Sequence, residues 1–584
     1  MAPTKPLPYN DSFSSTEDYV ESLLDLVENN ELLRTLCGGV HVLDFFTSDP
    51  PLYSRILPQD WRDFFEQHEI VDLLDLYLRE DLDSDDWICS GARSWRSGPA
   101  PPASLVEYIK TVRRHLLDRI QSANQCTRNR TQKKLPHHVA VGMTIKKVHE
   151  VGLFASYIDN LAAEISASLP SDEPISHLVD FGSGQSYLGR ALASEPYNRH
   201  LVAIESKVHN AERAKFFDVK ARLVEGRKVM RNKKAFRNGE LLADEPGASS
   251  DLPPPSPEPV QTHSYSVAKN DVEYPEKGQG TIQHVEHRIS SGDLTDVIAS
   301  IPRTDEKNLM VISLHSCGNL VHHGLRSLTL NPSVKAVAMV GCCYNLITER
   351  LGPATYKHPV LRPTTFAHPR LGGEGETCDP DGFPMSKRLC TYGENGKGVR
   401  LNITARMMAV QAPANWGKVD SDSFFKRHFY RALLQRIFLD RGVVGPPSED
   451  HSDATTSSHR SGGVPILIGS LRKTCYDTFL TYVRGALAKL IDSETWGAVM
   501  QEKMGDITNG EIQHYAETYK AGQKELSVMW SMMAFSAGVV EAAIVVDRWL
   551  WLREQGEVGE AWVESLFDYR LSPRNLVVVG IKKQ

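Results

Sequence analysis

The sequence predicts an α/β protein in which a mainly parallel sheet is accompanied by long helical regions. From about residue 137 onward, apolar runs alternate with segments of helical periodicity, which is the pattern of strands joined by crossover helices. Helical periodicity also dominates one region before these runs and one region after them. At 584 residues the chain is too long for one compact core, so we expect about two to four structural units.

The N-terminal part of the chain, residues 1–125, is predicted to be helical. Ser15 suits a helix N-cap, and apolar residues recur after it at the spacing of one helix face: Val20, Leu23, Leu24 and Val27. A second helical segment is expected over 61–80. The stretch 90–104 is rich in Gly, Ser and Pro and is typical of a linker.

Most of the sheet is predicted to lie within residues 137–400, and residues 556–584 are expected to complete it. The expected strands are 177–182, 200–206, 284–290, 308–316, 336–344 and 575–583. A mostly helical block, 400–555, is predicted as an insertion before the last strands. Two tracts, about 240–280 and 445–463, are predicted to be disordered because they bury too little apolar surface to offset the entropy of ordering.

The stretch HLVDFGSGQSYLGRALA (177–193) carries the main functional signal. Asp180 ends an apolar run, two glycines supply a turn, and a helical segment follows whose N-terminus would face a bound ligand. Glu205 ends the next expected strand about 20 residues beyond the glycines, where a carboxylate can accept hydrogen bonds from both ribose hydroxyls. The alternatives are a tight turn without a ligand and a solvated strand end at Glu205.

The acid before the turn indicates which nucleoside cofactor would fit. A carboxylate there repels a pyrophosphate but suits a ligand that carries an amino group and a sulfonium, as S-adenosylmethionine does. Asp293 follows the third expected strand, where it could read an adenine amino group or simply form an Asx turn. The candidate cofactor-binding residues are Asp180, Gly182, Ser183, Gly184, Gln185, Glu205, Asp293 and Leu294.

Further motifs accompany this turn along the chain. They are KKVHEV (146–151), SLHSCGNL (313–320), VGCCYNL (340–346), GFPMSK (382–387), ARMMAVQ (405–411), YRALLQ (430–435), VVDRWLWLREQG (545–556) and LFDYRLSPRNLVVV (566–579). Together, in this order and from about residue 50 to the C-terminus, they resemble the methyltransferase-like protein 25 family. The resemblance implies a class I (Rossmann-like, seven-stranded) methyltransferase fold that uses S-adenosylmethionine, with a helical N-terminal region. The H-x-C-G and C-C-Y motifs are also similar to those of a tRNA 2′-O-methyltransferase family, which indicates a relative and not a substrate.

One residue departs from the pattern of that family. Relatives usually have Gly at the sixth position after the acid of the turn, where this chain has Ser186. A side chain there is expected either to crowd the methionine carboxylate of the cofactor or to donate a hydrogen bond to it.

In the fold that the resemblance implies, the loop after the fourth strand lies where the transferred methyl group emerges. The candidate catalytic residues are His315, Cys317 and Tyr344. His315 could act as a general base near neutral pH, or it could belong to a structural cluster with His322 and His323. Tyr344 is expected to form a wall of the substrate or cofactor pocket, because its ring can stack on a planar acceptor group.

Two further groups of residues leave alternatives open. Cys342 and Cys343 could be small packing residues, zinc ligands together with His315 and Cys317, or reactive thiols. Packing is favoured and no metal is expected, because adjacent cysteines rarely ligate one tetrahedral ion. The KKVHEV residues (146–151) either close over the methionine end of the cofactor or cap the helix that precedes the first strand.

The charge pattern bears on the substrate. The whole chain is acidic, with a net charge of −7, but residues 207–237 carry eleven Lys and Arg against three Asp and Glu, and residues 127–134 add four more basic residues. Such clusters are typical of phosphate contacts with nucleic acid, although a solvated helix is the alternative. RNA or an RNA-associated protein is therefore the expected substrate. A protein methyltransferase that docks a partner through its helical region, and a catalytically inactive scaffold, are the alternatives, and Ser186 favours the scaffold.

The composition excludes other classes of protein. No membrane span, secretory signal or DNA-specific motif is expected. The nine cysteines are scattered, which argues for a reducing compartment, the cytoplasm or the nucleus.

Overall fold

The computed structural model describes residues 3–80, 82, 94–96, 98–119, 134–169, 174–224, 280–301, 308–351, 378–445 and 465–583. The two tracts predicted to be disordered lie outside the described residues, apart from their outermost positions Gly280 and Gly445.

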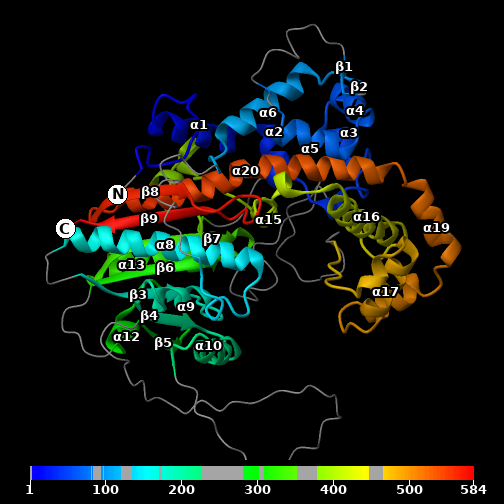
Figure 1. Ribbon diagram of the computed structural model, residues 1–584. Helices are drawn as coiled ribbons and strands as arrows, with labels where there is room; N and C mark the ends of the chain where they lie inside the picture. The colour runs from blue at the N-terminus through cyan, green and yellow to red at the C-terminus, as the bar shows by residue number, and fades with distance from the viewer. Residues whose placement is uncertain are drawn as a thin grey trace, which may run out of the picture.

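A seven-stranded sheet forms the centre of the molecule (Figure 1). Its strands are β3 (Ile175–Phe181), β4 (His200–Glu205), β5 (Thr281–Glu286), β6 (Asn308–Cys317), β7 (Val334–Cys343), β8 (Val558–Ser565) and β9 (Leu576–Lys582). The spatial order is β5-β4-β3-β6-β7-β9-β8. The first five strands are parallel, and β9 pairs antiparallel with both β7 and β8. The predicted α/β architecture with a mainly parallel sheet is confirmed.

Side chains alternate between the two faces of this sheet because consecutive residues of a strand point in opposite directions. Met310 and Ile312 pack on the face covered by α8 (Ile145–Ser168) and α9 (Tyr187–Ala193). Leu309 and Val311 pack on the opposite face, with α12 (Thr295–Ala299), α13 (Leu320–Leu330) and α20 (Gly522–Glu554). Both faces are therefore buried, which explains why the strands read as continuous apolar runs in the sequence.

Two strands differ from the predicted ones. β5 starts three residues earlier than expected and ends at Glu286. β8 was absent from the predicted strands, because Gly559 and two glutamates interrupt its apolar pattern. β8 lies at an edge of the sheet, where such a polar strand is tolerated.

The predicted N-terminal and inserted helical regions are both present, and they share one hydrophobic core. The N-terminal helices are α1 (Thr16–Asn29), α2 (Glu31–Arg34), α3 (Leu52–Ile56), α4 (Gln59–Glu66), α5 (Ile70–Leu78) and α6 (Ala103–His115). The other helices are α10 (Val208–Lys220), α14 (Lys387–Cys390), α15 (Ile403–Met408), α16 (Lys418–Asp440), α17 (Phe479–Ile491), α18 (Gly497–Met504) and α19 (Asn509–Thr518). Short π or 3-10 helices occupy Thr35–Gly39, Val42–Asp44, Tyr344–Leu346, Glu394–Gly396, Pro413–Asn415 and Lys473–Tyr476.

The expected linker 90–104 is more structured than predicted where it is described. β1 (Ser94–Trp95) and β2 (Gly98–Pro99) form a small antiparallel pair. Trp95 is buried against Phe64 and His68, and this burial holds the segment on the N-terminal helices.

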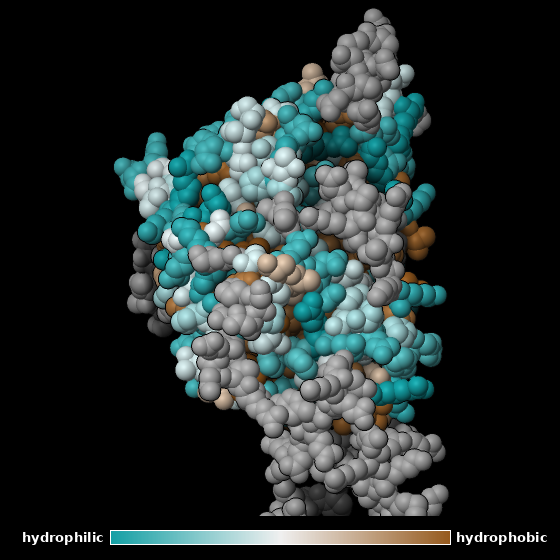
Figure 2. Space-filling model, turned by 60° about the vertical axis from the view of Figure 1, so that its left-hand side comes forward, coloured by the Kyte–Doolittle hydropathy of each residue, from teal (hydrophilic) through white to brown (hydrophobic). Residues whose placement is uncertain are grey.

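Helix α20 joins the helical regions to the sheet. It is long and apolar enough to cross a membrane, but 94% of its most apolar window is buried inside the protein. Figure 1 shows it crossing between the N-terminal helices and strands β8 and β9. On the face shown in Figure 2, hydrophilic residues predominate and hydrophobic ones form only small separate areas. The apolar character of α20 is therefore that of a core helix.

Candidate active site

The turn after β3 forms an open cradle at the carboxyl end of the sheet. Gly182 and Gly184 both have positive φ, 66° and 59°, a conformation that favours glycine. A Cβ added to Gly184 would meet nothing within 4 Å, so the space beside this residue is open. A Cβ on Gly182 would lie 2.8 Å from Leu320 Cδ2, so a larger residue there would disturb α13.

Glu205 lies beside this turn, as its spacing predicted. Its Oε2 accepts a hydrogen bond from the Gly184 backbone N–H at 2.9 Å, and its Oε1 accepts one from the Lys207 N–H at 2.8 Å. Ser206 Oγ also lies 3.5 Å from Oε1, whereas Oε2 keeps a further acceptor site. The carboxylate is therefore held in place with capacity to bind hydroxyl groups of a ligand.

Asp180 is a buried carboxyl group at the end of β3. Only 3% of the residue is exposed. Burial, together with a smaller contribution from the Glu205 carboxylate, raises the pKa of Asp180 to about 8, although the charge of Lys147 opposes this rise. The carboxyl group is therefore largely protonated near neutral pH, and a cation bound beside it would stabilise the ionised form that the protein itself stabilises little.

The structure corrects the expectation for Ser186. This residue is fully buried with a left-handed φ of 51°, and it precedes the first residue of α9. Its Oγ would lie only 2.3 Å from a Cβ added to Gly189. This hydroxyl has no hydrogen-bond partner among the described residues. The hydroxyl therefore points into the first turn of α9 and neither crowds nor contacts the open side of the cradle. Gly189 makes room for it.

The remaining turn residues have local partners. The Ser183 N–H donates to the Ile204 carbonyl at 3.0 Å, which ties the turn to β4. The Gln185 Oε1 accepts a hydrogen bond from the Tyr187 hydroxyl at 2.7 Å. These bonds fix the backbone of the turn and orient it toward the sheet edge.

Asp293 and Leu294 lie before α12 and differ in exposure. Asp293 is exposed, and its Oδ1 accepts hydrogen bonds from Thr295 N and Oγ1 at 2.9 and 2.6 Å, which is the Asx-turn arrangement. Leu294 is 2% exposed, and its N–H donates to Asn331 Oδ1. Leu294 is thus a core residue, so only the free oxygen of Asp293 remains available to a ligand.

The half-buried His315 at the end of β6 pairs with the buried carboxylate of Glu150. His315 Nε2 lies 2.9 Å from Glu150 Oε2, and Glu150 Oε1 accepts a hydrogen bond from Ser572 Oγ at 2.7 Å. Burial opposes ionisation of Glu150, but the hydrogen bonds from His315 and Ser572 and the charges of His315 and Lys147 outweigh it and lower its pKa to about 2. The ionised Glu150 accepts a hydrogen bond from His315 Nε2–H, so Nδ1 is the other ring nitrogen, on the side away from Glu150.

The backbone of His315 is unusual for a residue in a strand. Its φ is 73°, a left-handed value that costs free energy outside glycine and recurs at functional sites. Residue Glu150 lies in the first turns of α8, which Thr144 caps by accepting a hydrogen bond from the Lys147 N–H. The KKVHEV motif thus positions a carboxylate behind His315 and places Lys146 and Lys147 near it.

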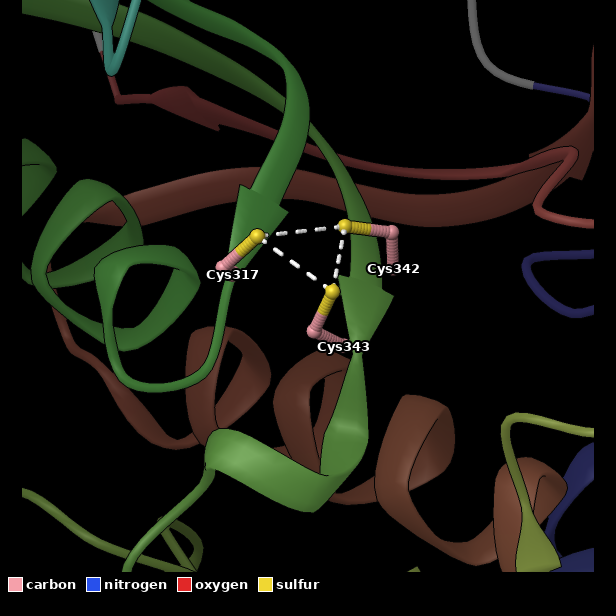
Figure 3. A group of neighbouring side chains, drawn as sticks. All are labelled: Cys317, Cys342 and Cys343. Carbon is pink, nitrogen blue, oxygen red and sulfur yellow. Dashed lines mark hydrogen bonds between the residues drawn. The ribbon is translucent and has the colours of Figure 1, made fainter. Parts of the chain in front are cut away.

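Three thiols converge beside His315 at the ends of β6 and β7. Cys317 Sγ lies 3.5 Å from Cys342 Sγ and 3.4 Å from Cys343 Sγ, and the last two are 3.4 Å apart (Figure 3). The pKa of Cys343 is lowered because the other two thiols donate hydrogen bonds to it, whereas the pKa of Cys342 is raised by the same contacts.

The prediction that Tyr344 forms a pocket wall is wrong. The residue is 2% exposed, and its hydroxyl donates to Glu541 Oε1 of α20 at 2.8 Å. Arg548 and Arg574 lie over its ring, 5.6 and 5.5 Å from the centroid. Burial raises the pKa of Tyr344. The residue belongs to the polar network that fixes α20 on the sheet.

The structure also separates His315 from the histidines of α13. His322 is buried and its Nδ1 bonds to the Asp381 carbonyl at 2.8 Å. Asn319 bonds to Thr348 and Asp379 and thereby anchors the loop after β6. These residues support the loop, whereas His315 faces Glu150.

Comparison with known proteins bears on this site. Residues 146–350 match a family model described as a methyltransferase domain. This segment is therefore similar to methyltransferase domains. The predicted class I fold is thereby confirmed, since the seven-stranded sheet has the expected mainly parallel arrangement. The matched segment starts at Lys146 and includes the turn, the His315–Glu150 pair and the three thiols.

Curated relatives of the methyltransferase domain carry the name that the sequence motifs indicated. The chain is 28% identical over 300 residues to a human protein named "Probable methyltransferase-like protein 25". The aligned residues make up 50% of this chain and 40% of that protein. The mouse protein of the same name is 29% identical over 285 residues, 48% of this chain and 38% of the relative. The chain thus matches about two fifths of the length of these relatives. No solved structure gave a significant match.

Sequence reasoning missed one residue of the methyltransferase domain. Glu150 was expected only to close over a cofactor or cap a helix, and its contact with His315 joins residues 165 positions apart. No local pattern announces such a pair. The available signal was that Glu150 is an acidic residue within KKVHEV, one of the motifs on which the family resemblance rests.

Proposed function

We propose that this chain is an S-adenosylmethionine-dependent methyltransferase. The observation that carries the proposal is Asp180, a buried carboxyl group with a raised pKa beside an open glycine turn. When bound, the cofactor would supply an electrophilic methyl group on a sulfonium. The α-ammonium group of its methionine part is the kind of cation that Asp180 lacks.

The residues of the turn have separate roles in this proposal. Asp180 binds the ammonium group, and Glu205 uses its remaining acceptor sites for ribose hydroxyls. Gly184 leaves room for the ligand beside the backbone. Asp293 offers its free oxygen to the adenine amino group. Because Ser186 points away from the cradle, the feature that favoured an inactive scaffold no longer does so.

His315 is the general base of the proposed reaction. An acceptor hydroxyl or amine gives up one proton as it gains the methyl group, and His315 Nδ1 takes that proton. Glu150 holds Nε2–H and stabilises the resulting imidazolium by its negative charge.

We propose RNA, or a protein bound to RNA, as the acceptor. In the described part of the basic segment, Lys207, Arg213, Lys220 and Arg222 are exposed on or beside α10. This helix follows β4, whose end carries Glu205, so its start, with Lys207 at the N-cap, lies at the same edge of the sheet as the cofactor turn. The free state of the seven described cysteines agrees with action in the cytoplasm or nucleus.

Transfer of radiolabelled methyl groups tests this proposal. An extract of cells that lack the protein is incubated with the full chain and labelled cofactor, and the products are treated with ribonuclease or protease. We expect ribonuclease-sensitive label that disappears with Asp180→Asn. Label in protein alone would contradict the RNA assignment, and absence of label in both fractions would contradict the enzyme.

Binding to RNA gives an independent test of the substrate. Affinity for total RNA should fall about 10³-fold or more between roughly 50 and 200 mM salt if several phosphates are contacted. A double change, Arg213→Glu with Lys220→Glu, should weaken binding without affecting cofactor affinity. The matched control is Lys503→Glu on α18, outside the basic segment.

A further inference from the structure

The three thiols at the ends of β6 and β7 are arranged more closely than packing alone requires. Their sulfur atoms all lie within 4.8 Å of one another, close enough to bind one metal ion together. Among the described His, Cys, Asp and Glu residues, these are the three that form such a group. Cys317 is exposed, while Cys342 and Cys343 are half-buried. Three unpaired sulfurs therefore face one point that is accessible from solvent.

The local backbone explains how two consecutive cysteines reach the same point. In a regular strand, adjacent side chains point to opposite faces. Here the pairing of β6 and β7 shifts register between Leu314 and Ser316 and again between Ser316 and Cys317. Cys343 has φ −104° and ψ 75°, which is not extended. In Figure 3 all three side chains consequently turn toward one another between the two strand ends.

We propose that Cys317, Cys342 and Cys343 bind one Zn²⁺ ion through three thiolates and leave the fourth coordination position open. Zn–S bonds of about 2.3 Å in a tetrahedron place sulfurs about 3.8 Å apart. The observed separations of 3.4 to 3.5 Å need an outward movement of only a few tenths of an ångström. Thiolates are the ligands that zinc prefers among the available side chains.

The surroundings of the thiols suit a zinc–thiolate centre. Zn²⁺ with three thiolates carries one net negative charge. Arg574 acts electrostatically on Cys343, Arg548 on Cys342 and Lys207 on Cys317, so positive charges surround the group. The protons of the thiols leave to solvent as the metal binds.

The open position distinguishes this site from a closed structural zinc site. Three protein ligands with one free position is the pattern of zinc sites that bind a reacting ligand. Among the described residues no fourth His, Cys, Asp or Glu joins the group. The free position is at the same sheet edge as His315, so a water molecule or a lone pair of an acceptor would occupy it.

Metal content of the purified full chain tests the proposal. The protein is exposed to Zn²⁺ under reducing conditions, freed of excess metal and analysed by elemental mass spectrometry. We expect about one zinc per chain, falling below about a tenth of that in Cys317→Ser and in Cys343→Ser. Cys378→Ser and Cys390→Ser, which change cysteines outside the group, should keep their zinc.

Cobalt gives a second readout that does not depend on activity. Co²⁺ in place of Zn²⁺ should produce thiolate charge-transfer absorption in the near ultraviolet and the intense visible bands of a tetrahedral site, both lost in Cys317→Ser. Absence of bound zinc in the wild type, equal zinc in Cys317→Ser, or a disulfide between Cys317 and either neighbour after reducing purification would overturn the proposal. Titration of the same samples with S-adenosylhomocysteine reports the proposed function separately, because the metal measurements require no cofactor.

Discussion

The carboxyl edge of the sheet has two halves that are built differently. At the ends of β3 and β4, a glycine turn and two carboxylates form a cradle held mainly by backbone hydrogen bonds. At the ends of β6 and β7, an imidazole pairs with a carboxylate from α8, and three thiols lie close to one another. In our proposals the first half binds a nucleoside that carries a cationic group, and the second half takes up a proton and binds a metal ion. The comparison teaches that cofactor binding and acceptor chemistry can be altered independently.

The largest effect is expected on the acceptor half. His315→Ala should lower the rate of methyl transfer by about 10²- to 10⁴-fold, because the general base is lost. S-adenosylhomocysteine affinity should stay within about twofold, since His315 is outside the cradle. Glu150→Gln should reduce the rate less and leave cofactor affinity unchanged. Equal rates in His315→Ala and wild type would mean that the imidazole serves only packing.

The next largest effect is expected on the cofactor half. Asp180→Asn should weaken S-adenosylhomocysteine binding by about 10- to 100-fold, because a charge-assisted hydrogen bond to the ammonium group is lost. 5′-Methylthioadenosine, which lacks the amino acid part, is the control and should bind both proteins equally.

The same substitution should raise stability. Burial raises the pKa of Asp180 in the folded state, so the folded protein holds a proton that the unfolded chain releases, and stability declines as pH rises from about 4 to about 8. Asparagine removes this cost and should raise the free energy of unfolding by about 1 kcal/mol or more near pH 7.5. A lower melting temperature together with unchanged cofactor affinity would show that Asp180 is a structural residue.

A smaller effect should separate the cradle from the helix behind it. Gly189→Ala should destabilise the protein by about 1 to 3 kcal/mol, because its Cβ would overlap Ser186 Oγ. Adding Ser186→Gly should restore most of that loss, since it removes the hydroxyl and suits the positive φ. Unfolding by urea measures both changes. If Ser186→Gly alone weakens cofactor binding more than it alters stability, the serine faces the ligand after all.

The smallest effect is expected at Tyr344. Tyr344→Phe removes the hydrogen bond to Glu541 and should cost about 0.5 to 1.5 kcal/mol of stability with no change in methyl transfer. A large loss of activity at unchanged stability would show that Tyr344 contributes to the reaction with the acceptor.

The two halves also differ in how far the sequence predicted them. Asp180, the glycines and Glu205 lie within 26 residues and follow the strand–turn–helix pattern, so local spacing places them together. Glu150 and His315 come from segments far apart, and their contact depends on how α8 packs on the sheet. Cys342 and Cys343 were expected to serve packing and not to ligate one ion together, because an irregular strand end cannot be read from apolar periodicity. The predicted orientation of Tyr344 was wrong and that of Ser186 was left open for a similar reason. The orientation of Tyr344 depends on its contact with α20, and that of Ser186 depends on Gly189, and no motif specifies either contact.

The most direct test of the central claim is calorimetric titration with S-adenosylhomocysteine between pH 6 and pH 8. Asp180 must lose its proton to bind the ammonium group, so affinity should rise with pH by up to about tenfold per unit and level off near pH 8, with proton release to the buffer. The rise should be absent for 5′-methylthioadenosine and for Asp180→Asn. Binding that is independent of pH, or no binding by the folded protein, would contradict the account.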